Sequence, residues 1–267
     1  MTAPGERRPS GAPGAEYRLI RIDDESSPDL LELSPVIAEA VAESVGAGQA
    51  PPTAVIRRQR PYALLGPKDR RLPSLSRGVK VLRDAGLPVY ERIAGGTAVI
   101  LDEGCLSFAV ARPCRDFTAI HQNFNLLTVG VRLALARLGI DAEFGAAPGS
   151  FCEGPYDLVF RGRKIAGVAQ AMRRGFALVS GMLIVSQDPV PVTNLLNEFY
   201  AAAGGTPGLV PDNVVTLSDL VGRPLTLDEV EDALKAGFWE AHRYVESAPT
   251  AAELERAGRL LTERRLG

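Results

Sequence analysis

The chain has 267 residues, of which 46% are hydrophobic and 23% charged, and its formal net charge is −2. This composition has too much apolar content for a disordered chain, and the charge balance gives no electrostatic reason to expect binding to nucleic acid or to an anionic membrane. The length suits one large or two small domains. No apolar run reaches the roughly 18 residues that a membrane span needs, and residues 1–15 lack the apolar core of a secretory signal, so we expect a cytoplasmic protein.

The cysteine and histidine contents argue against disulfide and metal chemistry. Three cysteines (Cys105, Cys114 and Cys152) are too few and odd in number for a disulfide framework. Two histidines, His121 and His242, leave no Cys/His cluster with the spacing of a zinc site, so we expect no metal. Only four of the 30 basic residues are lysines, which hints that a lysine in this chain supplies a titratable point charge.

Short apolar runs typical of strands alternate with amphipathic stretches in the first half of the chain. Residues 1–15 are rich in Gly, Pro and Arg, which predicts a disordered N-terminal segment. In chain order we then predict a strand at 16–22, a helix within 28–45 that starts at 28 or only at 34, strands at 54–57 and 62–66, a helix at 74–85, and strands at 88–93, 97–101 and 106–111.

The clearest helix is predicted over 118–138, where apolar residues recur at helical spacing. A loop of unusual length follows at 139–155, because Gly, Ala and Pro dominate there. The remaining predictions are a hairpin of strands at 156–160 and 165–170, one or two strands in 175–185, helices at 192–203, 226–245 and 251–261, and a short strand at 213–217.

Strands grouped in runs with few helices between them indicate an α+β fold, with a mixed or antiparallel sheet flanked by helices, rather than a parallel βαβ sheet. The helical residues at the end of the chain suggest a division into a main domain at 16–204 and a small helical C-terminal extension at 205–267.

The first motif with chemical potential is the loop sequence GSFCEGPYD at 149–157, in which Cys152 lies between Gly and Pro residues just before a strand. A free cysteine is more often a small packing residue than a nucleophile, so spacing alone favours a loop cysteine without a role. Cys105 and Cys114 flank the strand at 106–111, and we interpret both as structural or incidental.

The second motif is RGRKIAG at 161–167. A tight turn with exposed cations accounts for it, but Lys164 also enters a strand of small apolar residues, where it could point into a cleft. Burial there would lower the pKa of this lysine and a nearby thiolate would raise it. A glycine in mid-strand, here Gly167, often marks the close approach of a ligand.

The third motif is RIAGGTAVILD at 92–102. Its paired glycines, Gly95 and Gly96, either build a turn or let an acyl chain or a phosphate approach the backbone. The motif lacks the third glycine and the following helix of a dinucleotide-binding fingerprint.

Taken in this order, the motifs resemble the biotin/lipoate protein ligase and octanoyltransferase superfamily over about residues 55–185. The matching sequence is LG at 65–66, Arg92 with GG at 95–96 and DEG at 102–104, YDL at 156–158, and GRKIAG at 162–167 followed by Gln170. The resemblance implies a catalytic domain at 16–204 whose mixed sheet holds an acyl group or an acyl adenylate. It also implies acylation of a lysine on lipoyl domains, those of the 2-oxoacid dehydrogenases and the glycine cleavage H protein.

Departures from the family pattern indicate a branch of this superfamily. ATP-using lipoate ligases carry a third glycine and then a His-Asp pair, where this chain has Thr97 and Leu101, with only Asp102 remaining. A cysteine shortly before the Tyr/Asp strand is characteristic of the cysteine-dependent octanoyltransferases, and Cys152 lies four residues before Tyr156. The resemblance therefore favours transfer of octanoyl from the H protein to E2 subunits without a cofactor.

On this interpretation, Cys152 is the nucleophile and Lys164 is an ammonium that favours the thiolate, protonates the leaving amine and later deprotonates the incoming lysine. We expect oxyanion donors in the backbone at 149–152 or at Gly167, and an acyl groove floored by residues 95–96 and 98–100. The candidate substrate-binding residues are Arg92, Gly95, Gly96, Thr97, Asp102, Tyr156, Asp157 and Gly167.

Three alternatives stay open at this point. A sibling transferase would take octanoate from acyl carrier protein with the same Cys152–Lys164 pair. In an ATP-dependent lipoate ligase, Lys164 would contact the adenylate and Cys152 would be incidental. A carrier-binding module without activity is the third.

Arg57 and Arg58 are candidates for facing an acidic carrier protein, and we interpret His121 as solvated.

Overall fold

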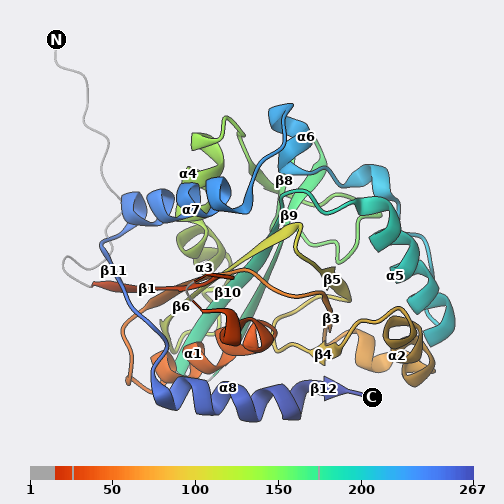
Figure 1. Ribbon diagram of the computed structural model, residues 1–267, viewed down its shortest axis with the longest axis horizontal. Coiled ribbons are helices and arrows are strands. Elements are labelled where there is room, and N and C mark those ends of the chain that lie inside the picture. The colour runs from red at the N-terminus through yellow and green to blue at the C-terminus, as the bar shows by residue number, and fades with distance from the viewer. Residues whose placement is uncertain (1–15, 26, 174) are drawn as a thin grey trace.

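The structure is a computed structural model, and it describes residues 16–25, 27–173 and 175–267. The predicted disordered segment 1–15 lies outside these residues. The described chain forms one eight-stranded and one four-stranded sheet (Figure 1). The order of strands in the large sheet is β11 (Tyr244–Glu246), β1 (Tyr17–Ile22), β2 (Thr53–Arg57), β6 (Cys105–Cys114), β10 (Gly175–Ile184), β9 (Arg163–Arg173), β8 (Asp157–Phe160) and β7 (Glu143–Gly145). The small sheet is β12 (Arg265–Leu266), β4 (Val89–Glu91), β3 (Tyr62–Leu65) and β5 (Val99–Leu101).

The large sheet is mixed, as predicted. Strand β1 pairs in parallel with β2 and β11, whereas β2, β6, β10, β9, β8 and β7 pair successively in antiparallel fashion. Alternate side chains therefore point to opposite faces. On β2, for example, Ala54 and Ile56 belong to one hydrophobic cluster and Val55 to another.

Helices cover both faces of the large sheet (Figure 1). One face packs against α1 (Ile37–Gly46) and α8 (Ala251–Arg264), and the opposite face against α3 (Ile120–Leu127), α4 (Val129–Arg137) and α7 (Leu227–Ala241). The small sheet packs against α2 (Leu75–Asp84) and α5 (Pro189–Ala203). Short helical segments complete the described chain: η1 (Pro28–Leu33), η2 (Asp69–Arg71), η3 (Pro211–Asn213) and α6 (Leu217–Val221). The α+β prediction is thus confirmed.

The single helix predicted over 118–138 is wrong, because α3 and α4 are separate helices that meet at Thr128. The break accompanies very close packing of α4 on α7. A Cβ atom on Gly130 would come within 2.4 Å of the Phe238 ring, and one on Gly237 within 2.1 Å of the Gly130 carbonyl oxygen. The direction of α4 is thus set by contacts with residues more than a hundred positions away.

Other boundaries also differ, and the helix predicted at 226–245 ends at Ala241, before strand β11. The predicted strand at 213–217 is wrong, since only Val214 bridges to Lys164 before Thr216 caps helix α6 by accepting from the Asp219 N–H. The predicted loop at 139–155 contains the short strand β7. The helix expected within 28–45 divides into η1 and α1, and α1 begins at Ile37.

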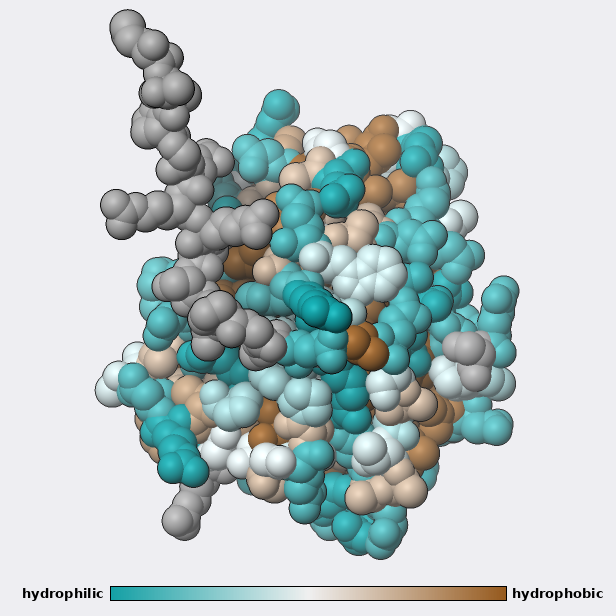
Figure 2. Space-filling model, turned by 90° about the vertical axis from the view of Figure 1, so that its left-hand side faces the viewer, coloured by the Kyte–Doolittle hydropathy of each residue, from teal (hydrophilic) through white to brown (hydrophobic). Residues whose placement is uncertain are grey.

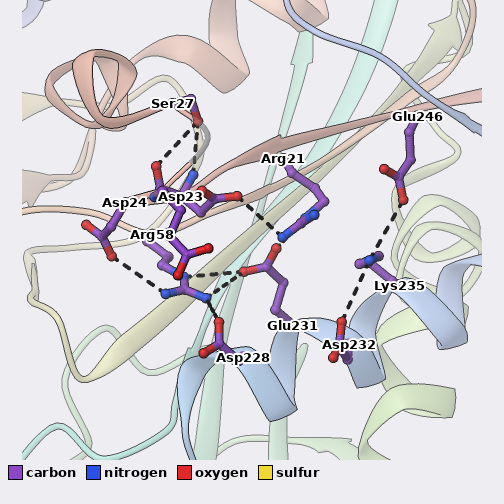
Figure 3. Close-up of polar contacts among 11 residues, drawn as sticks. Arg21, Asp23, Asp24, Ser27, Arg58, Asp228, Glu231, Asp232, Lys235 and Glu246 are labelled. Carbon is purple, nitrogen blue, oxygen red and sulfur yellow. Dashed lines mark hydrogen bonds and ion pairs between the residues drawn. The ribbon is translucent and has the colours of Figure 1, made fainter.

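The segment after residue 205 is mainly helical, with α6, α7 and α8, and it also supplies edge strands β11 and β12 to the two sheets. An ion-pair cluster holds α7 against the β1 edge (Figure 3). In this cluster Glu231, whose side chain is 3% exposed, pairs with Arg21 and Arg58, and Arg58 also pairs with Asp24 and Asp228. The prediction that Arg58 faces a carrier protein is therefore wrong, because its guanidinium pairs with carboxylates of the same chain.

Hydrophilic side chains dominate the face shown in Figure 2, and apolar ones occur there singly or in small groups. Within the described residues, every helix is too short or too polar to cross a lipid bilayer.

Candidate active site

Cys152 lies in the turn that leads into β8, and its backbone has φ of 49°, in the left-handed region. A non-glycine residue is rare there and is held in place only when its surroundings are rigid. Two neighbours provide that rigidity. Phe151, 1% exposed, is buried in the cluster under the small sheet, and the Asp157 carboxylate accepts the Gly154 N–H at 2.9 Å. The turn therefore presents a half-buried thiol at a defined position.

The glycine motif wraps around this thiol. Arg92 Nη2 donates to Cys152 Sγ at 3.2 Å and to the Thr97 carbonyl at 2.7 Å, and the Thr97 N–H donates to the same sulfur at 3.3 Å. Gly96 has φ of +103°, and a Cβ atom there would lie 2.5 Å from the sulfur. The paired glycines thus make room for the thiol as well as forming a turn.

Lys164 lies directly behind the Cys152 turn and is fully buried. Its Nζ donates to the Phe151 carbonyl at 2.8 Å, to the Cys152 carbonyl at 3.0 Å and to Asp157 Oδ2 at 2.9 Å. An ammonium has three N–H donors, so all of them are satisfied here. The structure therefore brings together Cys152, Lys164 and Asp157, with the charge of Lys164 balanced by a carboxylate that is itself 1% exposed.

The electrostatics of the turn favour a thiolate. Burial by itself would raise the pKa of the Cys152 thiol, but the charges of Arg92 and Lys164 and the Thr97 N–H lower it below its ordinary value. Burial also raises the pKa of Asp157, against the lowering effect of the Lys164 ammonium. By contrast, burial raises the pKa of the Cys105 thiol, which makes that cysteine inert.

Sequence reasoning assigned Arg92 to substrate binding and missed its contact with the thiol. It also missed a network beneath the glycine motif, in which the Tyr200 hydroxyl accepts the Ala98 N–H at 3.1 Å and donates to Asp69 at 3.4 Å. Burial raises the pKa of Asp69 to about 6, although the Gly66 N–H bonds to this carboxylate. Gly66 belongs to a motif quoted above, but nothing local connects it to Tyr200.

Two cavities meet at Cys152. The inner cavity runs between the two sheets and is mainly apolar. Its apolar lining includes Leu64, Ala94, Val99, Leu101, Leu178 and Met182. The outer cavity opens beside the start of α3 and is lined by Gly95, Gly96, Phe117, Ile120, Phe124 and Tyr156, among others. The Cys152 thiol thus lies between a mainly apolar cavity and an open one.

The remaining predicted residues divide between these cavities. Gly167 and Val99 line the inner one, whereas Gly95 and Gly96 line the outer one, so the residues of the expected groove floor are divided between the two cavities. Tyr156 stacks on Phe124 with ring centroids 3.9 Å apart. Its hydroxyl lies 3.1 Å from His121 Nδ1, so exposed His121 nevertheless has a partner.

Asp102 is the predicted residue that lies outside the site. It lines neither cavity, and its carboxylate closes the turn before β6 by accepting the Gly104 N–H at 2.8 Å. Throughout the described residues, no group of three His, Cys, Asp or Glu side chains is placed to hold a metal ion.

Replacing Arg92 by methionine is expected to shift the alkylation of Cys152 by iodoacetamide to higher pH, by about one pH unit. The thiolate is the reactive form, and Arg92 is the foremost charge that lowers the thiol pKa. At pH 7 the variant should therefore react more slowly than the native protein. Peptide mass spectrometry assigns the label to Cys152, and an unchanged pH profile would contradict this role.

Gly96→Ala is expected to slow the same alkylation at pH 7 at least about tenfold, because the added methyl displaces the sulfur from Arg92 and Thr97. Gly86→Ala is the matched control. Its φ is +84°, but a Cβ atom there meets nothing within 4 Å. Both variants carry the backbone strain of an L residue at positive φ. Equal slowing in both would show that strain, rather than contact with the thiol, is responsible.

Comparison with known proteins identifies relatives of this chain. The family model described as lipoyl protein ligase A/B catalytic domain matches residues 36–239. A relative from Geobacillus kaustophilus, named octanoyl-[GcvH]:protein N-octanoyltransferase, is 33% identical over 208 residues, which is 74% of this chain and 73% of the relative. A lipoyl-[GcvH]:protein N-lipoyltransferase from Listeria monocytogenes is 29% identical over 71% of each chain.

Solved structures support the fold. The crystal structure of lipoate-protein ligase A bound with ATP superposes with a TM-score of 0.72 and 24% identity, covering 93% of this chain and 95% of that one. A bi-partite lipoate protein ligase from Thermoplasma acidophilum gives a TM-score of 0.68 and 23% identity, over 94% and 93% of the two chains. The chain belongs to the lipoyl protein ligase A/B catalytic-domain family.

Proposed function

We propose that the protein is an acyltransferase that moves an octanoyl or lipoyl group from the glycine cleavage H protein to a lysine on the lipoyl domains of E2 subunits, through a thioester on Cys152. The carrying observation is the Cys152 thiol at the junction of the two cavities, held by Arg92 and Thr97 and backed by the Lys164 ammonium. Relatives named octanoyl- and lipoyltransferases, with GcvH in their names, support the donor.

In the first half-reaction, the Cys152 thiolate attacks the carbonyl carbon of the acyl-lysine amide on the donor. A carbon–sulfur bond forms, the carbon–nitrogen bond breaks, and the leaving nitrogen takes a proton from Lys164. The products are a thioester, the free donor lysine and a neutral Lys164, so charge and protons balance. Lys164 has three partners, so it must release one, the Cys152 carbonyl in our proposal, to reach the leaving nitrogen.

The second half-reaction reverses these roles. The incoming lysine amine attacks the thioester, Lys164 takes the proton from its nitrogen, and the thiolate leaves. The amide formed replaces the amide broken, so the cycle needs no ATP. Asp157 orients Lys164 and balances its charge in the protonated state.

In the tetrahedral intermediate, the oxyanion lies on the acyl carbon that is bonded to the Cys152 sulfur. The hydrogen-bond donors that stabilise this oxyanion must therefore lie near the sulfur. Two of the expected donors are occupied, since the Gly149 N–H bonds to Glu153 and the Ser150 N–H to the Ala147 carbonyl. We assign the role to Arg92 Nη2 and the Thr97 N–H, which already lie within 3.3 Å of the sulfur.

The inner cavity accounts for acyl binding. Burial of an alkyl chain is worth about 0.8 kcal/mol per CH₂ group, and the lining between the sheets is largely apolar. The outer mouth is where the carrier lysine would enter. The proposal places the protein in the cytoplasm, where thiols stay reduced and Cys152 remains available, and it involves neither nucleic acid nor membrane.

The test is intact mass spectrometry of the protein mixed with octanoylated H protein and no ATP. We expect one added octanoyl group, removable by hydroxylamine as a thioester is, and its passage to an E2 lipoyl domain. Absence of the adduct with this donor would overturn the proposal. Labelling by octanoyl-acyl carrier protein alone would indicate the other transferase class, and lipoyl-AMP formed from lipoate and ATP would indicate a ligase.

A further inference from the structure

The inner end of the cavity between the sheets is not apolar. Four residues lie in one row across neighbouring strands of the large sheet: Gly167 on β9 faces Met182 on β10, Met182 faces Ser107 on β6, and Ser107 faces Arg57 on β2. All four line the inner cavity. Strands lie about 4.8 Å apart, so Arg57 starts about 14 Å across the sheet from Gly167. The row runs from the Lys164 end of the site to a buried cation.

Arg57 is 5% exposed, which contradicts the expectation that it faces a carrier protein. Its Nε donates to the Ser34 carbonyl at 3.0 Å, but its Nη1 is buried without a hydrogen-bond partner in the described residues. Burial lowers the pKa of Arg57, and the interaction of its guanidinium with the buried Tyr62 phenol opposes this lowering. Glu39 lines the same cavity, but both of its carboxylate oxygens are bonded to Arg264.

A buried guanidinium without a carboxylate partner is costly, and it stays charged at all physiological pH values. Arg57 lines the inner cavity, so its side chain lies beside the space that the end of an acyl chain would fill. The methyl end of a saturated octanoyl chain offers no acceptor and leaves the Nη1 N–H unsatisfied. A lipoyl group carries two sulfur atoms at that end, and sulfur accepts hydrogen bonds, although weakly.

We propose that Arg57 is a specificity residue whose free N–H binds a sulfur atom at the far end of the acyl chain, so that the enzyme prefers lipoyl to octanoyl. This inference rests on the proposed function and names its acyl substrate. A site with an unsatisfied donor disfavours a ligand that lacks the acceptor. Because sulfur is a weak acceptor, the expected preference is modest, about tenfold in the rate of Cys152 acylation.

The experiment mixes the protein with equal amounts of lipoylated and octanoylated H protein, and intact mass gives the ratio of the two acyl-enzymes at early times. We expect lipoyl to lead about tenfold in the native protein, Arg57→Met to bring the ratio close to one, and Arg57→Lys to restore part of it. Arg112→Met is the control. Arg112 is half-buried on β6, the strand next to β2, it donates to the neutral Asn123 amide oxygen and it does not line the cavity, so the native ratio should persist.

A native protein without preference, or an Arg57→Met variant that keeps the native ratio, would overturn the inference. If Arg57→Met fails to fold, the native protein still decides, because an 8-hydroxyoctanoyl donor, which carries a stronger acceptor at the chain end, must also outcompete octanoyl. If neither donor forms a thioester, the proposed function has failed instead. Calorimetry with lipoamide and octanamide then tests Arg57 without catalysis, and equal affinities would refute the preference.

Discussion

Cys152→Ala is expected to form no acyl-enzyme and to transfer octanoyl at least about 10³-fold more slowly than the native protein. The reason is that alanine supplies no atom that can bond to the acyl carbon. Intact mass after mixing with octanoylated H protein reads out the thioester, and a gel-shift or mass assay on the E2 lipoyl domain reads out the product.

The control for this variant is Cys114→Ala, which removes a buried thiol that lines neither cavity. It should retain both the thioester and the transfer rate. Cys152→Ser retains the shape of the side chain, but its hydroxyl is not ionised at neutral pH, so we expect it to behave as the alanine variant does. A hydroxylamine-labile adduct that persists in Cys152→Ala would rule out this nucleophile.

Lys164→Met is expected to affect both stability and transfer. The substitution leaves Asp157, 1% exposed, without its cation, and breaking a buried ion pair from one side costs about 3–5 kcal/mol of the free energy of unfolding. Transfer should fall about 10³-fold, since the proposed mechanism assigns proton exchange with the lysine nitrogens to Lys164. Urea unfolding and the transfer assay measure the two effects.

A double variant separates these two losses. In Lys164→Met/Asp157→Asn the uncompensated carboxylate is gone, so part of the stability should return while transfer stays low. Asp157→Asn alone serves as the reference for the loss of the bonds to the Gly154 and Val168 N–H groups. If the double variant regains near-native transfer, Lys164 only supports the turn and the proton-transfer role is refuted.

The strained Cys152 turn rests on the firmly held side chain of Lys164. This arrangement affects the ionisation of the Cys152 thiol. The carbonyls of Cys152 and Phe151 accept from Lys164, while the Cys152 sulfur contacts Arg92 and the Thr97 N–H. One cation therefore contacts the backbone of Cys152 and the other contacts its sulfur. Both lower the thiol pKa, yet only Lys164 has a carboxylate partner in the turn.

Local sequence patterns predicted most elements because strand alternation and helical spacing reflect which face of each element is buried. Strands β1, β2, β3, β5 and β10 and helices α2, α5 and α8 lie where these patterns placed them, within a few residues. The patterns failed where distant contacts decided the outcome. The break at Thr128 accompanies the packing of α4 on α7, and Val214 meets Lys164 instead of continuing a strand.

The sequence pointed to Cys152 and Lys164 through the family resemblance, because spacing alone favoured a loop cysteine without a role; both residues belong to one short stretch of chain. Only the tertiary structure decided what surrounds that pair. Arg92 follows β4, Tyr200 lies on α5 and Arg57 lies on β2, and the tertiary structure places Arg92 at the thiol, Tyr200 beneath the glycine motif and Arg57 on the inner cavity. When the burial of a side chain depends on packing between two sheets, the hydrophobic pattern of its own strand does not show it. Arg57 therefore resembled an exposed cation in the sequence, although it is buried in the structure.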